Sequence, residues 1–210
     1  MKLYDFKLAP NPRRVNMFLA EKGMEIPSVQ INTRELEQFN EDFKKVSPRC
    51  IVPVLELDDG TCIAESVAIC RYIEEIQPEP PLFGRDPKEK ALIEMWNRHA
   101  EADCYSSAAN LVRNSLPAFK DRALAGLPSG VPQIPELAAR GRSTLDRFMH
   151  YLDAHLAGSP FVAGDSFSVA DITVYVTIDF AKRADYAPPE DCANVKRWYD
   201  QIAARPSAAA

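Results

Sequence analysis

The sequence predicts two domains of different class, a small α/β domain followed by an all-helical domain. Up to residue 76, short strand-like segments alternate with helix-like ones, whereas nearly everything after residue 86 has helical periodicity. Between them, Gln77–Leu82 contains three prolines and can neither continue a helix nor join a sheet. We therefore expect domains at 1–76 and 87–210, joined by a linker at 77–86.

Composition excludes several classes of protein. The 210 residues are 46% hydrophobic and 26% charged, which is typical of a folded domain. A net charge of -5 argues against nucleic-acid binding, and no apolar run approaches the ~20 residues that span a bilayer. The five cysteines form no CxxC pair and the three histidines lack zinc-like spacing, so we expect a cytoplasmic protein without a metal.

The first elements predict a parallel strand–helix–strand unit. Lys2–Phe6 alternates apolar and polar residues as a strand does. Pro12 suits the first turn of a helix, and Gly23 is expected to end that helix. Ser28–Ile31 then forms a second strand, which a right-handed crossover places parallel to the first.

The next elements predict an antiparallel hairpin and a helix. Val52–Leu57 and Thr61–Ala64 are strand-like and are separated by Asp58-Asp59-Gly60, a strong hairpin turn signal. Glu65-Ser66 begins a helix whose apolar residues recur at helical spacing. A parallel half followed by a hairpin and a helix is the order of a thioredoxin-like domain.

The remaining chain predicts a helical bundle. Helices are expected from Lys88 to about Asn114, over Leu137–Leu156 and over Asn194–Ala204. Ser168 and Asp171 predict a capped helix start, and the helix that follows is apolar on most faces, so we expect it to be central.

Four segments in order, at matching spacing, carry a family resemblance, namely Leu8–Val15, Ser47–Leu55, Ala64–Ile73 and Phe161–Ile172. With them the chain resembles the cytosolic glutathione S-transferases, and Ala-Pro-Asn-Pro-Arg-Arg is most similar to a bacterial and fungal branch that lacks the N-terminal catalytic serine or tyrosine. This resemblance implies the glutathione transferase fold over essentially the whole chain.

The resemblance implies a binding site for glutathione as co-substrate. Glu65 would hold the γ-glutamyl ammonium, and the Ser66 hydroxyl with the amides at the helix start would hold its carboxylate. A cis Pro53 would leave the backbone of Val52 free to pair with the cysteinyl residue. Gln38 would bind the glycine carboxylate. In the alternative interpretation, Glu65 and Ser66 only cap a helix and Pro53 is an ordinary edge-strand proline.

The family often has a lysine or glutamine where this chain has Ile51, which cannot hold a carboxylate. Neighbouring cations can offset that loss electrostatically, but we expect most of them to be solvated surface charges. They are Lys44, Lys45, Arg49, Arg13 and Arg14.

Activation of the thiol needs a donor, because a thiol with a pKa of ~8.5 is mostly protonated at neutral pH. Ala9 stands where most relatives have a hydroxyl. We predict that the Asn11 amide donates a hydrogen bond to sulfur, unless Asn11 only caps its helix. The branch resemblance suggests an alternative activator, a water held by polar groups of the second domain such as Asn114 and Ser115, and Tyr105 is a further donor on the same helix.

The electrophile is expected between the domains, near Leu8, Tyr105, Leu111 and Val112, with 119–135 as a loop over the cleft. The implied function is conjugation of the glutathione thiolate to a hydrophobic electrophile, as in detoxification, by a homodimer that binds neither nucleic acid nor membrane.

Two alternatives remain open at this point. One is a glutathione-dependent reductase of disulfides or peroxides. The other is a non-catalytic glutathione- or protein-binding member of the fold, which Ala9 and Ile51 favour.

Overall fold

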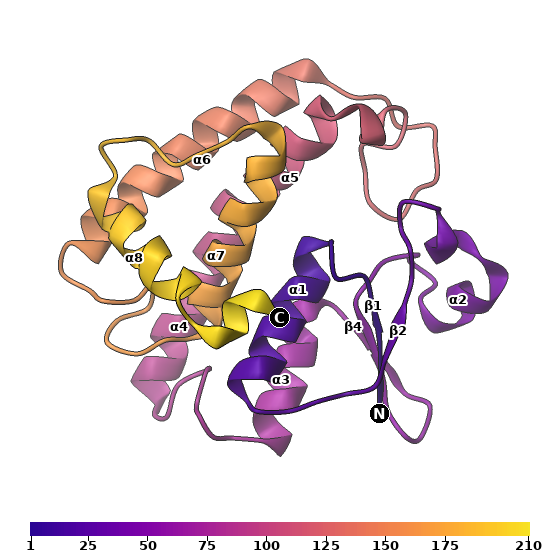
Figure 1. Cartoon of the computed structure of the whole chain (residues 1–210), viewed down its shortest axis with the longest axis horizontal. Helices are drawn as coiled ribbons and strands as arrows, with labels where there is room; N and C mark the ends of the chain where they lie inside the picture. The colour runs from indigo at the N-terminus through magenta and orange to yellow at the C-terminus, as the bar shows by residue number, and fades with distance from the viewer.

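The computed structural model describes residues 1–210 and contains a four-stranded sheet unit beside a helical unit (Figure 1). The strand order is β2-β1-β3-β4, with β1 parallel to β2 and β3 antiparallel to both β1 and β4. This is the thioredoxin-like arrangement that the order of elements predicts. The elements are β1 (Lys2–Asp5), α1 (Pro10–Glu21), β2 (Ser28–Gln30), α2 (Glu41–Val46), β3 (Val54–Glu56), β4 (Cys62–Ala64) and α3 (Ser66–Ile76).

Local sequence signals set the ends of these elements. Helix α1 begins two residues before the predicted Pro12, with Pro10 and Pro12 both in its first turn. It ends before Gly23, whose positive φ of 62° favours glycine. Gly60 has a φ of 85° in the β3–β4 turn, as the hairpin signal predicts.

The helical unit surrounds one central helix. Helix α7 has every residue except Asp179 buried, which confirms that it is central. Figure 1 shows α1 and α3 between the sheet and this unit, and α1 packs directly on α7. The helices are α4 (Pro87–His99), α5 (Ser106–Ser115), α6 (Pro135–Leu156), α7 (Val169–Ala181) and α8 (Ala193–Ala203). None of them is both long and apolar enough to cross a membrane.

The predicted continuous helix from Lys88 to Asn114 is interrupted. Ala100–Tyr105 is a π-helical segment between α4 and α5. Both the backbone amide and the hydroxyl of Ser106 donate to the carbonyl of Glu101, five residues earlier, and this wider bonding accounts for the local change of pitch. Segments of this type are common at functional sites.

The capping motif before α7 forms as predicted and also reaches α8. The Asp171 carboxylate accepts hydrogen bonds from the amide and hydroxyl of Ser168 at 2.9 and 3.0 Å. It also accepts from the Val162 amide at 2.9 Å and from Trp198 Nε1 at 2.8 Å. Burial raises the pKa of Asp171 to about 6, so the carboxylate is ionised at pH 7.

Ion pairs fix α1 against the helical unit. Arg13 lies 2.5 Å from Asp179 of α7, and Arg205 near the C-terminus lies 2.7 Å from Glu21. Figure 1 places the C-terminus beside α1. The first turn of α1 is therefore held at the junction of the two units, where the cavity described next is found.

Candidate functional site

A cavity of about 600 Å³ lies where the first turns of α1 and α3 face the π-helical segment. It brings together four of the residues that the sequence singled out, from three elements far apart in the chain. Its lining is mainly polar and consists of Asn11, Arg14, Glu65, Ser66, Val67, Ala68, Arg71, Glu94, Arg98, Glu101 and Tyr105.

Glu65 presents an accessible carboxylate at the edge of this cavity. Its backbone has a φ of 69° immediately before α3, a conformation that non-glycine residues adopt rarely. Oε1 lies 2.5 Å from Nη1 of Arg49, and both side chains are exposed. Glu65 can therefore exchange Arg49 for another cation.

Ser66 is oriented by a buried arginine. Arg14 Nη1 donates to Ser66 Oγ at 3.0 Å and pairs with Glu101 Oε1 at 2.8 Å. Because Ser66 Oγ accepts from Arg14, its own hydroxyl proton remains available for a ligand. The sequence alone does not suggest these contacts, because Ser66 and Glu101 lie 52 and 87 residues from Arg14.

The expectation that Arg14 is a solvated surface charge is wrong, because its side chain is only 3% exposed. Its spacing of four residues from the buried Phe18 was the one available signal, since residues at this spacing share a helix face. Arg13 is also largely buried and paired with Asp179. Lys45 and Arg49 are exposed, as expected.

Val52 carries unpaired backbone groups two residues before β3. Neither its amide nor its carbonyl makes a hydrogen bond within the protein. Pairing of Val54 with Ala64 brings the residues before β3 opposite those after β4. The Val52–Pro53 bond is cis, as the family resemblance implies.

Asn11 and Tyr105 line the same cavity as Glu65 and Ser66. Ala9 is the N-cap of α1, so Asn11 does not cap this helix. Burial raises the pKa of Tyr105, a rise that the charge of Arg14 and the polar side chain of Asn11 oppose. Tyr105 is therefore protonated at neutral pH and can serve as a hydrogen-bond donor, not as a base.

The first turn of α1 also provides one free backbone N–H as a hydrogen-bond donor. Proline has no N–H, so neither Pro10 nor Pro12 contributes an amide to the first turn. The amide of Arg13 is bonded to the carbonyl of Ala9. The Asn11 amide is thus the one free backbone donor among the first four helical residues.

Val52 and Pro53 do not line the cavity, and neither do Gln38, Asn114 and Ser115. Asn114 donates to the Asn110 carbonyl and accepts from the Ile134 amide, and Ser115 donates to the Leu111 carbonyl. Gln38 is buried and its Oε1 has no partner. The roles that the sequence suggests for Gln38, Asn114 and Ser115 stay predictions.

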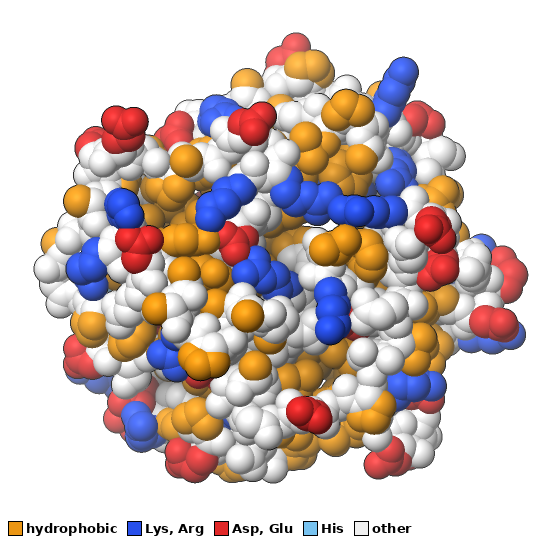
Figure 2. Space-filling model, in the orientation of Figure 1, with side chains coloured by type: hydrophobic (Ala, Val, Ile, Leu, Met, Phe, Trp, Pro, Cys, Tyr) orange, Lys and Arg blue, Asp and Glu red, His pale blue; other side chains and the backbone are white.

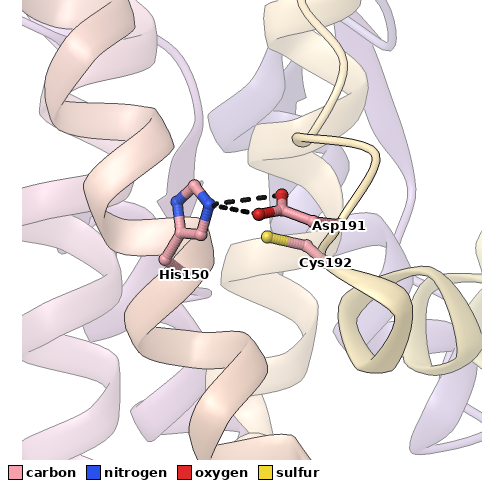
Figure 3. Close-up of side chains that lie close together, drawn as sticks. All are labelled: His150, Asp191 and Cys192. Carbon is pink, nitrogen blue, oxygen red and sulfur yellow. Dashed lines mark hydrogen bonds and ion pairs between the residues drawn. The ribbon is translucent and has the colours of Figure 1, made fainter.

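A separate cluster joins α6 to the residues before α8. His150 Nε2 lies 3.2 Å from each carboxylate oxygen of Asp191, and the Cys192 sulfur points toward the same ring (Figure 3). The donor atoms lie within 4.8 Å of one another and are of types that bind zinc. Burial and nearby carboxylates raise the pKa of the Cys192 thiol to about 11. None of these residues lines the cavity, and the absence of a metal stays a prediction.

Comparisons with known proteins agree on one family. Residues 9–76 match the glutathione S-transferase N-terminal domain and residues 135–201 match the C-terminal domain. Glutathione S-transferase 2 of Saccharomyces cerevisiae is 38% identical over 99% of this chain and 87% of the yeast protein.

Solved structures give the same result. A glutathione S-transferase domain-containing protein of Marinobacter aquaeolei superposes with a TM-score of 0.91 at 36% identity, over 99% of both chains. A Gtt2-class glutathione S-transferase of Vibrio parahaemolyticus has a TM-score of 0.83 at 37% identity, over 99% of this chain and 94% of that one. The chain belongs to the glutathione S-transferase family.

Proposed function

We propose that this protein is a glutathione transferase that joins the thiolate of glutathione to the electrophilic carbon of an apolar substrate. The observation that carries the proposal is a cavity lined by an exposed acid, Glu65, and an oriented hydroxyl, that of Ser66, together with the unpaired backbone of Val52 just before β3. Glutathione has an ammonium, two carboxylates and an extended peptide backbone that complement these groups.

The tripeptide docks from one end of the cavity to the other. Its ammonium takes the place of Arg49 at Glu65, and the α-carboxylate accepts from the Ser66 hydroxyl and from the amides that begin α3. The cysteinyl backbone pairs with the amide and carbonyl of Val52, as in recognition by strand addition. Gln38 is proposed to bind the glycine carboxylate.

The thiolate is stabilised by donors at the start of α1. Lowering a thiol pKa by two units needs about 2.7 kcal/mol of preference for the anion. The helix terminus supplies roughly 0.3–1 kcal/mol. Hydrogen bonds from Asn11 and the neutral Tyr105 are proposed to supply the remainder.

Asn11→Ala is expected to raise the pKa of enzyme-bound glutathione by about one unit, because a hydrogen bond to a charged group is worth roughly 1.5 kcal/mol. The measurement is ultraviolet titration of the thiolate band with saturating glutathione. Asn16→Ala is the matched control, since Asn16 lies on the same helix but bonds to Asp5 away from the cavity. An unshifted pKa in Asn11→Ala would remove Asn11 as the activator and leave Tyr105, Asn114 and Ser115.

The reaction itself is tested with two classes of acceptor. Turnover of a chloronitroarene with release of chloride is the expected result. Turnover of a glutathione mixed disulfide without any arene conjugation would instead assign the protein to the reductases. Retention on immobilised glutathione without either activity would make it a binding protein.

A homodimer is proposed on the exposed face formed by α4 and α6. Leu92 and Met95 of α4 and Tyr151 of α6 are 37%, 41% and 51% exposed, and Tyr151 stacks on Trp96 at 5.3 Å between ring centroids. Exposed apolar groups gathered on one face are typical of association surfaces. We also propose a cytoplasmic location and a role in detoxification, the former because all five cysteines are free thiols.

Tyr151→Glu is expected to weaken this dimer by about tenfold or more, because a charge would enter an apolar interface. Sedimentation equilibrium of the intact chain measures the dissociation constant. Leu124→Glu is the control, since Leu124 is similarly exposed but lies on the 119–135 loop. Equal dimerisation by the Tyr151 variant and the wild type would place the interface elsewhere.

A further inference from the structure

The cluster of His150, Asp191 and Cys192 has no part in the proposed transferase reaction, because none of the three residues lines the cavity. His150 lies on α6, whereas Asp191 comes 41 residues later and Cys192 is the N-cap of α8. The sequence predicts no metal because the histidines lack zinc-like spacing. Spacing along the chain does not report donor atoms that only the fold brings together, and this cluster is such a case (Figure 3).

The three side chains offer donor atoms at distances that suit one metal ion. An imidazole nitrogen, a carboxylate oxygen and a sulfur atom lie within 4.8 Å of one another, and His150 Nε2 is 3.2 Å from the Asp191 carboxylate. Zinc binds these atoms in a tetrahedron with bonds of about 2.0–2.3 Å, which places neighbouring donor atoms about 3.5 Å apart. Small rotations of the exposed His150 and Asp191 side chains therefore bring all three donors to one ion.

The ring of His150 is held in the orientation that a metal ligand needs. Its Nδ1 lies 2.7 Å from the backbone carbonyl of Asp146, one helical turn earlier. Because a carbonyl oxygen only accepts, Nδ1 carries the proton and donates it. In the neutral ring the lone pair is then on Nε2, the atom directed at Asp191 (Figure 3). Metal-bound histidines almost always have their second nitrogen held in this way.

The charge that acts on Cys192 is negative. Figure 2 shows Lys and Arg side chains in a row across the middle of one face. The charged groups that act on Cys192 are instead the carboxylates of Asp146, Asp153 and Asp191. Their field disfavours an isolated thiolate and attracts a cation for the same reason. A zinc ion satisfies both tendencies, because it supplies positive charge and holds the sulfur as a thiolate.

The cluster is open to solvent on one side. Cys192 is only 2% exposed, whereas the side chains of His150 and Asp191 are 52% and 73% exposed. An ion can therefore enter past these two ligands, and the fourth tetrahedral position faces water. Asp153 is not available as a further ligand, since its carboxylate accepts hydrogen bonds from two backbone amides at the start of α8.

We propose that His150, Asp191 and Cys192 form a zinc site, with water as the fourth ligand, that links α6 to the start of α8. Zinc replaces the proton of the Cys192 thiol, and this proton passes to the buffer. Because the ligands come together only in the folded chain, zinc binding stabilises the helical unit. The site adds a metal-dependent contribution to stability and does not take part in glutathione conjugation.

The test is titration of Zn²⁺ into the intact, metal-free protein with its thiols reduced. Isothermal titration calorimetry is expected to show one ion per chain. His150→Gln, Asp191→Asn and Cys192→Ser should each raise the dissociation constant by at least about tenfold, since even the loss of a group that only supports a ligand costs that much. Zinc at ten times its dissociation constant should raise Tm of the wild type by about 4 °C.

Co²⁺ gives a spectroscopic signature of the same site. Thiolate-bound Co²⁺ has a sulfur-to-metal charge-transfer absorption, which should appear in the wild type and disappear in Cys192→Ser. His150 and Asp191 are exposed, so their variants fold even if the buried Cys192→Ser substitution does not. In these two variants the cobalt absorption should need at least about tenfold more metal to develop.

The matched controls are Cys62→Ser, which removes the exposed cysteine, and Glu190→Gln, which neutralises the exposed neighbour of Asp191. Both should bind zinc as tightly as the wild type. The inference is overturned if metal at millimolar concentration produces neither heat nor the cobalt absorption. It is also overturned if binding persists in His150→Gln and Cys192→Ser but is lost in Cys62→Ser, because an exposed surface thiol would then hold the metal. Either result leaves the proposed transferase function unaffected.

Discussion

Glu65→Gln is expected to weaken glutathione binding by about 30-fold or more, because a charge-assisted hydrogen bond contributes roughly 2–3 kcal/mol. Glutamine keeps the shape of the side chain but removes the charge that holds the γ-glutamyl ammonium. Glu65→Ala should abolish detectable binding. Isothermal titration of glutathione into the intact protein measures both effects.

Glu75→Gln provides the control for this change. Glu75 lies on α3, the helix that Glu65 precedes, is exposed and does not line the cavity. Its substitution should leave glutathione affinity unchanged, and circular dichroism should show all variants folded. Wild-type affinity in Glu65→Gln would refute the assigned pocket.

Asp171→Ala is expected to lower the free energy of unfolding by about 3–5 kcal/mol, the range for removing one partner of a buried charged network. The substitution leaves the amides of Val162 and Ser168 and the indole N–H of Trp198 without their acceptor. These donors are buried and water does not replace the lost bonds without rearrangement. Equilibrium unfolding in urea measures the loss.

Asp165→Ala is the matched control, because Asp165 lies in the same loop but is exposed and makes no side-chain hydrogen bond. It should change stability by less than about 0.5 kcal/mol, as surface substitutions usually do. If Asp171→Ala unfolds at the same urea concentration as Asp165→Ala and the wild type, the capping network makes no measurable contribution to the free energy of unfolding.

Elements with local causes were predictable from the sequence. The β3–β4 hairpin follows from Asp58-Asp59-Gly60, and the start of α7 follows from the spacing of Ser168 and Asp171. In each case, residues within a few positions of one another determine the backbone. The central position of α7 was likewise indicated by its apolar residues on most faces.

The π-helical segment was not predictable in the same way. Its bonding depends on Ser106 taking the carbonyl of Glu101 within a helix that is also packed against α6 and α7. Apolar periodicity over Lys88–Asn114 describes an ordinary helix equally well. Tertiary packing therefore decided the local pitch.

The candidate site likewise combines residues that the sequence could identify with contacts that it could not. The resemblance singled out Asn11, Glu65, Ser66 and Tyr105, which the structure brings to one cavity. The contact of Arg14 with Ser66 and Glu101 depends on elements 52 and 87 residues apart, so no local pattern carries it. The contact with Ser66 forms only when α1 and α3 pack within the sheet unit, and the contact with Glu101 forms only when the two units pack together.

The most direct test of the central claim is a crystal structure of the protein with saturating glutathione. The account predicts the cysteinyl backbone within hydrogen-bond distance of the amide and carbonyl of Val52. It also predicts the γ-glutamyl ammonium on the carboxylate of Glu65, in place of Arg49. A tripeptide bound elsewhere, or an empty cavity at saturating concentration, would contradict it.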